Sequence, residues 1–169
     1  MEDNNFSWEQ LGDLQTGRPN LGLTTTVETY RLMEYTMRTV LGNKLGADMA
    51  KEIFVQAGEL AGKAFCEHYM DKNLPLNKFL AQMHEKLLEH TIGIFNVEKA
   101  DPEKLNFIVT ISEDLDCSGL SVTGNTVCEY DEGFLAGIFN TYTSKDFDVK
   151  EIDCWATGSR TCRFRLRLK

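Results

Sequence analysis

The sequence predicts a mixed α/β fold, of the α+β type, in which helices combine with a small set of antiparallel strands. Apolar residues recur at helical spacing in three segments between about residues 25 and 90. Two strand-like runs come next, then a further helical segment, and then a C-terminal β-hairpin. No repeat or linker interrupts this order, so we expect an N-terminal arm over residues 1–22 and a single domain over residues 23–169.

The arm carries turn-forming residues and two aromatic side chains, Phe6 and Trp8, which we expect to pack against the domain or against a second subunit. The first helix should begin near Thr25, because Thr25 and Glu28 have the spacing of a capping box. It should end at Gly42, since glycine commonly follows the last helical turn.

A second helix is predicted over residues 46–70 and a third over residues 76–90. On the second helix Gly58 and Gly62 lie four positions apart, which lets another backbone approach closely. We interpret this pair as core packing and not as a ligand site. Strands are then expected over residues 91–98 and 105–112.

A loop and a helix over residues 127–142 lead to the C-terminal hairpin. Residues 147–155 and 161–168 should pair about Gly158, which places Cys154 and Cys162 across from each other. Basic and apolar residues alternate along the last strand, as on a strand with one solvated face.

Four residues of this region, Cys128, Glu151, Cys154 and Cys162, are candidate ligands of one metal ion. Cys128 lies in the first turn of the preceding helix, where the helix dipole lowers the pKa of a thiol. Three thiolates and a carboxylate form a closed tetrahedral set, which suits a structural zinc. Their negative charge would need a nearby donor such as Arg160.

The geometry sets one condition. Glu151 and Cys154 are three residues apart and point to opposite faces of a regular strand, so both can bind one ion only if the strand bulges between them. Spacing alone also allows a buried pair of free thiols across the hairpin, or a disulfide.

Composition excludes several classes of function. The net charge of −8 disfavours binding to nucleic acids and to anionic membranes. No apolar run approaches the ~20 residues that span a bilayer, and the N-terminus lacks a signal pattern. We therefore expect a cytoplasmic protein, in which the five cysteines are thiols or metal ligands.

Two stretches of the chain resemble a known family. Residues 128–137, CEYDEGFLAG, and residues 151–164, EIDCWATGSRTCRF, are similar to the 4-vinyl reductase (hydrocarbon-binding) domain family. Leu21-Gly22, Tyr30-Arg31-Leu32 and the pair Gly58 and Gly62 also fit its pattern, so the resemblance covers most of residues 18–168.

The resemblance implies a helical layer on a small antiparallel sheet, as in TRAPP vesicle-tethering subunits and haem nitric-oxide sensor domains. Such domains are sensor modules of phenol- and toluene-responsive transcription activators, where a Cys, Glu, Cys, Cys set binds zinc. All four positions match here, at Cys128, Glu151, Cys154 and Cys162. The chain departs from those activators because it carries no ATPase domain and no helix-turn-helix.

Two other family activities find little support. The chain has no GxGxxG motif for a reductase cofactor. The Tyr-x-Ser-x-Arg motif of haem sensors reads Tyr142-Thr-Ser144-Lys145-Asp146 here, which lacks the arginine, although His84 or His90 could serve as a proximal ligand.

We therefore expect a module that binds a small hydrophobic or aromatic molecule. We also expect it to form a homodimer and to have no nucleic-acid or membrane partner. The alternative is an interaction or scaffold subunit of the TRAPP type with no free ligand. Catalysis is less favoured, because no nucleophile or base stands in a defined context. The expected pocket lies between helices and sheet, and its candidate lining residues are Phe65, Tyr69, Phe79, Met83, His84, Phe95, Phe107, Phe134 and Trp155.

Overall fold

The computed structural model describes residues 6–169, which divide into two compact units, residues 1–50 and 51–169. The first five residues of the predicted arm lie outside the described residues. The first unit holds the short helices η1 (Trp8–Leu11) and α1 (Leu14–Gly17), the long helix α2 (Val27–Leu45) and the start of α3 (Ala47–Tyr69).

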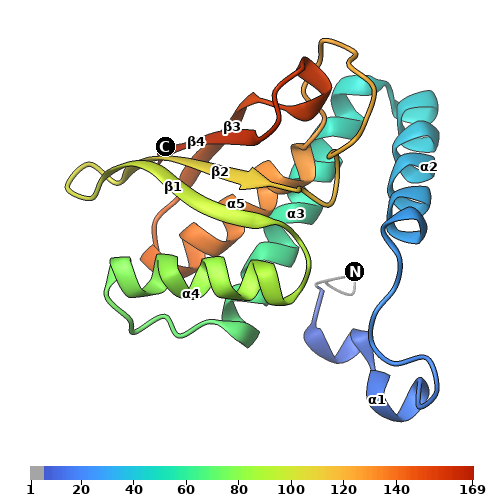
Figure 1. The fold of residues 1–169 in the computed structure, drawn as a ribbon, viewed down its shortest axis with the longest axis horizontal. Helices are drawn as coiled ribbons and strands as arrows, with labels where there is room; N and C mark the ends of the chain where they lie inside the picture. Colours follow the sequence, from blue (N-terminus) through green and yellow to red (C-terminus); the bar gives the residue numbers. More distant parts are fainter. Residues whose placement is uncertain (1–5) are drawn as a thin grey trace, which may run out of the picture. The chain divides into compact units, whose positions relative to one another are not determined.

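The second unit combines helices with one sheet (Figure 1). After α3 come α4 (Leu76–Glu89), the hairpin of β1 (Ile94–Asp101) and β2 (Asn106–Ser112), and α5 (Glu129–Thr143). The chain then forms β3 (Phe147–Asp153), the 3-10 turn η2 (Trp155–Thr157) and β4 (Cys162–Leu168). This order of elements is the one that the sequence predicts, so the predicted fold class is confirmed.

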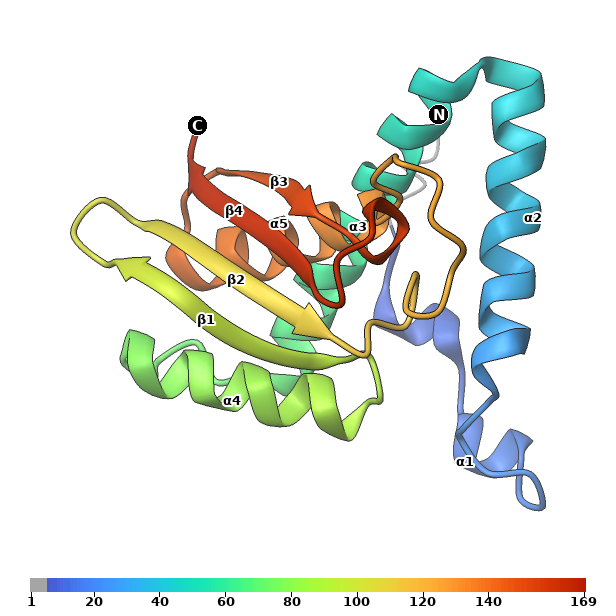
Figure 2. The same cartoon turned by 45° about the horizontal axis from the view of Figure 1, so that its top comes forward.

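The four strands form one antiparallel sheet in the order β1-β2-β4-β3. Helices cover one face of the sheet, where α4 packs against β1 and α5 against β3 (Figure 2). Side chains alternate accordingly, because successive residues of a strand point to opposite faces. On β4 Phe164 and Leu166 are fully buried in the core, while Arg163, Arg165 and Arg167 lie on the other face.

Helices α3 and α5 are in backbone contact. A Cβ atom added to Gly58 or Gly62 of α3 would lie 2.0 Å from the carbonyl oxygen of Tyr130 or Phe134, respectively. On the facing helix, a Cβ added to Gly133 would lie 1.9 Å from the Val55 carbonyl oxygen. Since these distances are far below van der Waals contact, only glycine permits the crossing. The interpretation of the α3 glycines as packing residues is confirmed, and their partner is α5.

Two features of α2 differ from the sequence prediction. The N-cap is Thr26, whose Oγ1 accepts a hydrogen bond from the Thr29 backbone N–H at 3.3 Å, and not Thr25. The helix also continues through Gly42 to Leu45, because a glycine inside a helix costs only about 1 kcal/mol. Gly46, with φ of 89°, follows the last turn instead.

The hairpin that carries two of the cysteines contains the required bulge. Glu151 pairs with Phe164 and Asp153 with Arg163, so Ile152 is an extra residue on β3. Glu151 and Cys154 are both buried as a result, and Ile152 is exposed. Gly158, at φ of 98°, turns the chain between η2 and β4. No helix of the described residues is long and apolar enough to cross a membrane.

Candidate metal centre and apolar core

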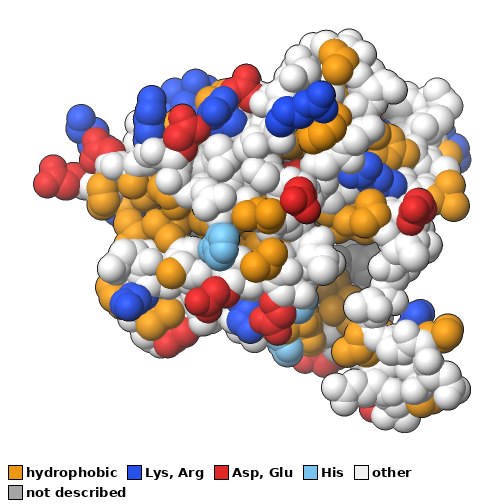
Figure 3. All heavy atoms as spheres, viewed as in Figure 1, with side chains coloured by type: hydrophobic (Ala, Val, Ile, Leu, Met, Phe, Trp, Pro, Cys, Tyr) orange, Lys and Arg blue, Asp and Glu red, His pale blue; other side chains and the backbone are white. Residues whose placement is uncertain are grey.

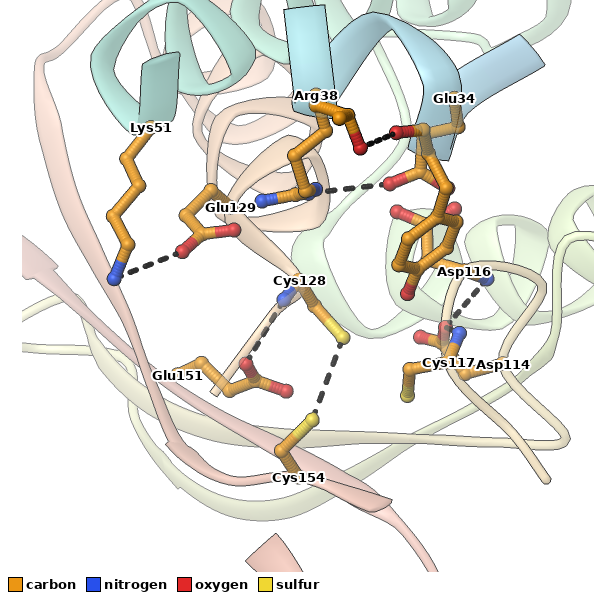
Figure 4. A network of polar contacts seen from close by, with 12 residues as sticks. Glu34, Arg38, Lys51, Asp114, Asp116, Cys117, Cys128, Glu129, Glu151 and Cys154 are labelled. Atoms are coloured by element: carbon orange, nitrogen blue, oxygen red, sulfur yellow. Dashed lines mark hydrogen bonds and ion pairs between the residues drawn. The ribbon is translucent and has the colours of Figure 1, made fainter. Parts of the chain in front are cut away.

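Four cysteine side chains meet at one end of the sheet. Cys117 comes from the loop between β2 and α5, Cys128 is the N-cap of α5, Cys154 precedes η2, and Cys162 begins β4. All four side chains are buried, and their Sγ atoms lie within 4.8 Å of one another. Figure 4 shows the sulfur atoms of Cys117, Cys128 and Cys154 pointing toward a common space.

The spacing of the sulfur atoms suits a single ion. A metal with four thiolate ligands at about 2.3 Å holds its sulfur atoms about 3.8 Å apart. Cys128 Sγ lies 3.8 Å from Cys154 Sγ and 3.8 Å from Cys162 Sγ, and Cys117 Sγ lies 3.0 Å from Cys162 Sγ. Two of these separations equal the edge of such a tetrahedron, and the third is shorter. The cluster is therefore positioned to hold a metal ion.

The hairpin turn positions Cys154 through its backbone. The Thr157 hydroxyl lies 3.1 Å from the Cys154 backbone nitrogen and 2.8 Å from the Cys154 carbonyl oxygen. The Ser159 backbone N–H also donates to that carbonyl, at 3.1 Å. Because these contacts fix the turn, they fix the direction of the Cys154 side chain relative to Cys162 across the hairpin.

The loop before α5 is tied to the same turn. Asp114 Oδ1 accepts hydrogen bonds from the backbone N–H groups of Asp116 and Cys117, at 2.8 and 3.1 Å, which curls the chain around Cys117. Further along, the N–H groups of Thr123 and Gly124 both donate to the Ala156 carbonyl oxygen, at 2.8 and 3.0 Å. The loop thus meets the hairpin through its backbone as well as through the Cys117 thiol.

Glu151 lies beside the cluster and bonds to its backbone. Glu151 Oε2 accepts a hydrogen bond from the Cys128 backbone N–H at 3.2 Å, while Oε1 is buried without a hydrogen-bond partner among the described residues. The Glu151 backbone N–H donates to Glu132 of α5 at 2.8 Å, and Lys150 pairs with the same carboxylate at 2.8 Å. Burial, followed by the charge of Cys154, raises the pKa of Glu151 to about 8.

The thiols differ in their tendency to ionise. Hydrogen bonds from Cys117, then from Cys128 and Cys162, lower the pKa of Cys154, because three thiol donors stabilise its thiolate. Hydrogen bonds with Cys117, then with Cys154 and Cys162, raise the pKa of Cys128. A cation that displaced the shared protons would remove this competition, since metal ligation needs every thiol deprotonated.

Buried carboxyl groups surround the thiols. Burial raises the pKa of both Asp114 and Asp131, and a side-chain hydrogen bond joins the two. Such a pair is consistent with one shared proton, because two buried carboxylates in contact cannot both ionise cheaply. Glu129 of α5 is paired with Lys51 of α3 at 3.4 Å (Figure 4).

Three of the four predicted ligands, Cys128, Cys154 and Cys162, are brought together, and the fourth, Glu151, lies next to them. Sequence reasoning missed Cys117. Its position in a glycine-containing loop, eleven residues before Cys128, is the one sequence feature that could have identified it as a candidate ligand. No short motif connects it to the other thiols. Arg160, the expected charge donor, instead stacks its guanidinium over the Trp155 ring at 4.7 Å.

The predicted pocket residues belong to one apolar core. Six of them are buried: Phe65 of α3, Phe79 and Met83 of α4, Phe95 and Phe107 of the first hairpin, and Phe134 of α5. Tyr69 and Trp155 are partly buried and pack against this core. The Phe65 ring contacts those of Tyr69 and Phe134, with centroids 5.1 and 5.3 Å apart.

His84 of α4 joins this core to the edge of the sheet. Its Nδ1 lies 2.5 Å from the carbonyl oxygen of Phe95, on the edge strand β1. A carbonyl only accepts, so Nδ1 carries the hydrogen and, in the neutral ring, Nε2 is left as an acceptor. Figure 3 shows apolar side chains reaching the surface along the line where α4 meets β1, with a histidine among them.

The two histidines considered as haem ligands, His84 and His90, make different contacts in the structure. His90, at the end of α4, packs its ring against Tyr69 and Phe65, with centroids 4.3 and 5.3 Å apart. His84 uses Nδ1 for the carbonyl of Phe95.

Comparison with known proteins places this fold. Residues 107–168 match the 4-vinyl reductase domain. Two uncharacterized proteins of Methanocaldococcus jannaschii are similar in sequence, one 30% identical over 59% of this chain and 58% of its own length, the other 23% identical over 69% and 64%. The chain thus spans less than two thirds of the length of these relatives.

Solved structures resemble the fold more broadly. The phenol-responsive sensory domain of the transcription activator PoxR, with phenol, aligns at a TM-score of 0.71 and 15% identity, over 87% of this chain and 76% of that one. A vinyl-4-reductase family protein of Methanocaldococcus jannaschii gives 0.63 and 13%, over 100% and 99%.

Two further solved structures have a similar fold. A trafficking protein particle complex subunit 3 of Naegleria fowleri, covalently bound to palmitic acid, gives a TM-score of 0.62 at 13% identity, over 85% of this chain and 95% of that one. An H-NOX protein of S. oneidensis gives 0.53 at 14%, over 92% and 86%. The expected relation in fold to tethering subunits and to haem sensor domains is confirmed.

Proposed function

We propose that this protein, which matches the 4-vinyl reductase domain over residues 107–168, binds a small hydrophobic or aromatic molecule and uses a zinc ion to close one end of the binding domain. The observation that carries the binding function is the aromatic core between the helices and the sheet, beside which the half-buried His84 places a polar ring at the edge strand β1. Ligand sites for small molecules combine apolar walls with a few placed polar groups in this way.

The fold comparison supports the same class of ligand. One protein of this fold is a phenol-responsive sensory domain, and another is covalently bound to palmitic acid. Both of those ligands are largely apolar. We propose the ligand space to lie among Phe65, Tyr69, Phe79, Met83, His84, Phe95, Phe107, Phe134 and Trp155, with access along the line where α4 meets β1 (Figure 3).

His84 supplies a specific element of this proposal. With Nδ1 bound to the Phe95 carbonyl, Nε2 of the neutral ring accepts a hydrogen bond from a ligand hydroxyl. A phenol then gains both apolar contact and one hydrogen bond, whereas toluene, of similar size, gains only the contact. A site built to accept a hydroxyl discriminates against an analogue that lacks one.

A ligand-titration experiment tests the binding function. Phenol, toluene and a medium-chain fatty acid are added during thermal unfolding, and at least one should raise the melting temperature. Free ligand at a hundredfold above its Kd stabilises the folded state by about 2.7 kcal/mol. His84→Leu should reduce the effect of phenol more than that of toluene, whereas Glu67→Leu, at an exposed position of α3, should change neither. If none of the three ligands stabilises the wild type at saturation, the binding function is wrong.

For the metal we propose zinc in a closed tetrahedral site. Cys128, Cys154 and Cys162 supply three thiolates, and the fourth ligand comes from Glu151, as the family resemblance implies, or from Cys117. Zinc favours such thiolate-rich sets, and a site with four protein ligands leaves no open position for a reacting water. Its role is therefore to stabilise the end of the domain. None of the five cysteines, all of which lie among the described residues, forms a disulfide, which fits the cytoplasm.

A second candidate function, assembly, is favoured by the surface of α2. Met33, Met37 and Val40 recur at helical spacing on this helix, and each is more than half exposed, as is the neighbouring Leu32. Exposed apolar stripes of this kind mark protein interfaces. We propose that they pair two copies of the chain, either to form the sensor dimer or, in the alternative, a scaffold subunit with no free ligand.

The mass of the protein in solution tests the dimer. Light scattering after size-exclusion chromatography should give twice the mass of the chain, and Met37→Glu should give a monomer. Thr39→Glu, on the same helix but outside the stripe, is the control and should stay dimeric. A wild type that remains monomeric at high concentration would exclude this interface.

A further inference from the structure

The metal site has one donor too many. Five buried side chains, the thiols of Cys117, Cys128, Cys154 and Cys162 and the carboxyl of Glu151, lie where a closed zinc site needs four. We infer that Cys117, and not Glu151, supplies the fourth ligand, so that the ion is bound by four thiolates and ties the β2–α5 loop to the hairpin. This inference rests on the proposed metal site and goes further by naming its ligands.

The distances between the sulfur atoms favour Cys117. Cys117 Sγ lies 3.0 Å from Cys162 Sγ, and all four sulfur atoms lie within 4.8 Å of one another. An ion at the centre of this group can reach each sulfur with small side-chain rotations. No carboxylate oxygen of Glu151 belongs to that group among the described residues.

One carboxylate oxygen of Glu151 already has a hydrogen-bond partner. Its Oε2 accepts the hydrogen bond of the Cys128 backbone N–H at 3.2 Å, and Cys128 precedes the first turn of α5. The other oxygen, Oε1, has no hydrogen-bond partner among the described residues, but it lies outside the group of ligand atoms that are within 4.8 Å of one another. Ligation by Glu151 would therefore require its side chain to move, and a movement that broke the Oε2 contact would leave the N–H of a buried residue unsatisfied. Retained, the bond holds a ligating residue in place, which is the usual task of a residue outside the ligand shell.

Backbone contacts of the Cys117 loop hold its thiol in this position. Asp114 fixes the Cys117 backbone N–H at 3.1 Å, and Thr123 and Gly124 fasten the far side of the loop to the Ala156 carbonyl. Ser112, just before the loop, lies 2.9 Å from the Thr161 hydroxyl beside Cys162. These independent contacts bring the loop to the hairpin, so the ion adds a ligand bond to an alignment that exists already.

Metal affinity in matched variants tests the inference. Zinc binding is measured by competition with a chromophoric chelator for the wild type, Cys117→Ser, Glu151→Gln and Cys66→Ala. Cys117→Ser should bind zinc more than about a hundredfold more weakly, because it removes a ligand. Glu151→Gln keeps an acceptor for the Cys128 N–H, so it should stay within about tenfold of the wild type. Cys66→Ala removes a buried thiol of α3 that is not part of the four-cysteine group and should bind as the wild type does.

Cobalt substitution counts the thiolates directly. The sulfur-to-cobalt charge-transfer band should correspond to four thiolates in the wild type and in Glu151→Gln. Per bound ion it should fall by about a quarter in Cys117→Ser, which retains three. Should Cys117→Ser fail to fold, alkylation of the wild type replaces it: Cys117 should be protected with zinc and modified after chelation.

These experiments distinguish a failure of the metal site from a failure of Cys117 as its fourth ligand. A wild type that binds neither zinc nor cobalt overturns the metal site itself. A wild type that binds one ion, with Glu151→Gln weakened strongly and Cys117→Ser unchanged, leaves the metal site standing and overturns the assignment of Cys117. Alkylation of Cys117 at equal rates with and without zinc overturns it as well.

Discussion

The Sγ atom of Cys117 lies 3.0 Å from that of Cys162, although the two residues are 45 positions apart in the sequence. The contact joins the loop after β2 to the first residue of β4, and the thiols of Cys128 and Cys154 complete the group. Four separate segments therefore meet at a single cluster, and each has its own local reason to be there.

Cys154→Ser should cost the protein its metal and much of its stability. The side chain comes from the turn that Thr157 and Ser159 fix, and its loss leaves only three thiols in the group. Removing a ligand of a structural zinc costs several kcal/mol of folding free energy, because metal binding and folding are coupled. Urea unfolding and metal analysis of the variant measure both losses.

A chelator supplies the control for Cys154→Ser. It should lower the unfolding midpoint of the wild type and leave that of the variant unchanged, since the variant has no ion to lose. Equal shifts in the two proteins would show that the variant keeps its metal.

Gly62→Ala should destabilise the protein by about 2 kcal/mol or more, because the added methyl group would overlap the Phe134 carbonyl and push α3 away from α5. Gly42→Ala is a matched control on α2, where an added Cβ meets nothing within 4 Å. It should stabilise the chain slightly, by up to about 1 kcal/mol, through helix propensity. Chemical denaturation of both variants measures the difference, and similar effects would refute the crossing.

Asn140→Ala should cost about 1–2 kcal/mol. The side chain of Asn140 donates to Glu59 of α3 at 2.9 Å and accepts from the Phe147 backbone N–H at 2.8 Å, so it links α3 and α5 to the start of β3. Its loss leaves the Phe147 N–H without its partner. Denaturant unfolding measures the cost, and a variant as stable as the wild type would show that water replaces both contacts.

Cys66 should resist alkylation in the folded protein at pH 8. Burial raises the pKa of its thiol from 9.0 to about 11, with the charge of Lys72 acting in the opposite direction. Only the thiolate reacts, so modification requires unfolding or strongly alkaline pH. The raised pKa has a consequence for stability: the contribution of Cys66 is complete below about pH 9 and is lost as the pH rises through about 11. Mass spectrometry of iodoacetamide-treated protein measures this, and rapid labelling of Cys66 at pH 8 would contradict its burial.

Local chemistry explains why much of this fold follows from the sequence. The alternation along β4, the glycine spacing on α3 and the Gly158 turn are short-range patterns, and each has the predicted structural consequence. The bulge at Ile152 can also be predicted from the sequence, because no regular strand can bury both Glu151 and Cys154 on one side. Element ends are harder to predict, as the passage of α2 through Gly42 illustrates.

The position of Cys117 is a feature that could not be predicted from the sequence. Its position depends on how a loop of irregular backbone folds back onto a hairpin, and that path is set by long-range contacts such as those of Thr123 and Gly124 with Ala156. No periodicity records such a path. Similarly, Gly58 and Gly62 of α3 contact the backbones of Tyr130 and Phe134 on α5, each 72 positions further along the chain, which spacing within one helix does not reveal.

The zinc content of the purified protein tests the central claim most directly. Elemental analysis of the wild type, expressed without added metal and passed through a desalting column, should give about one zinc per chain. Chelation should remove that zinc and lower the unfolding midpoint together. A protein that contains no metal, and whose unfolding curve is unchanged by a chelator or by added zinc, would contradict the account.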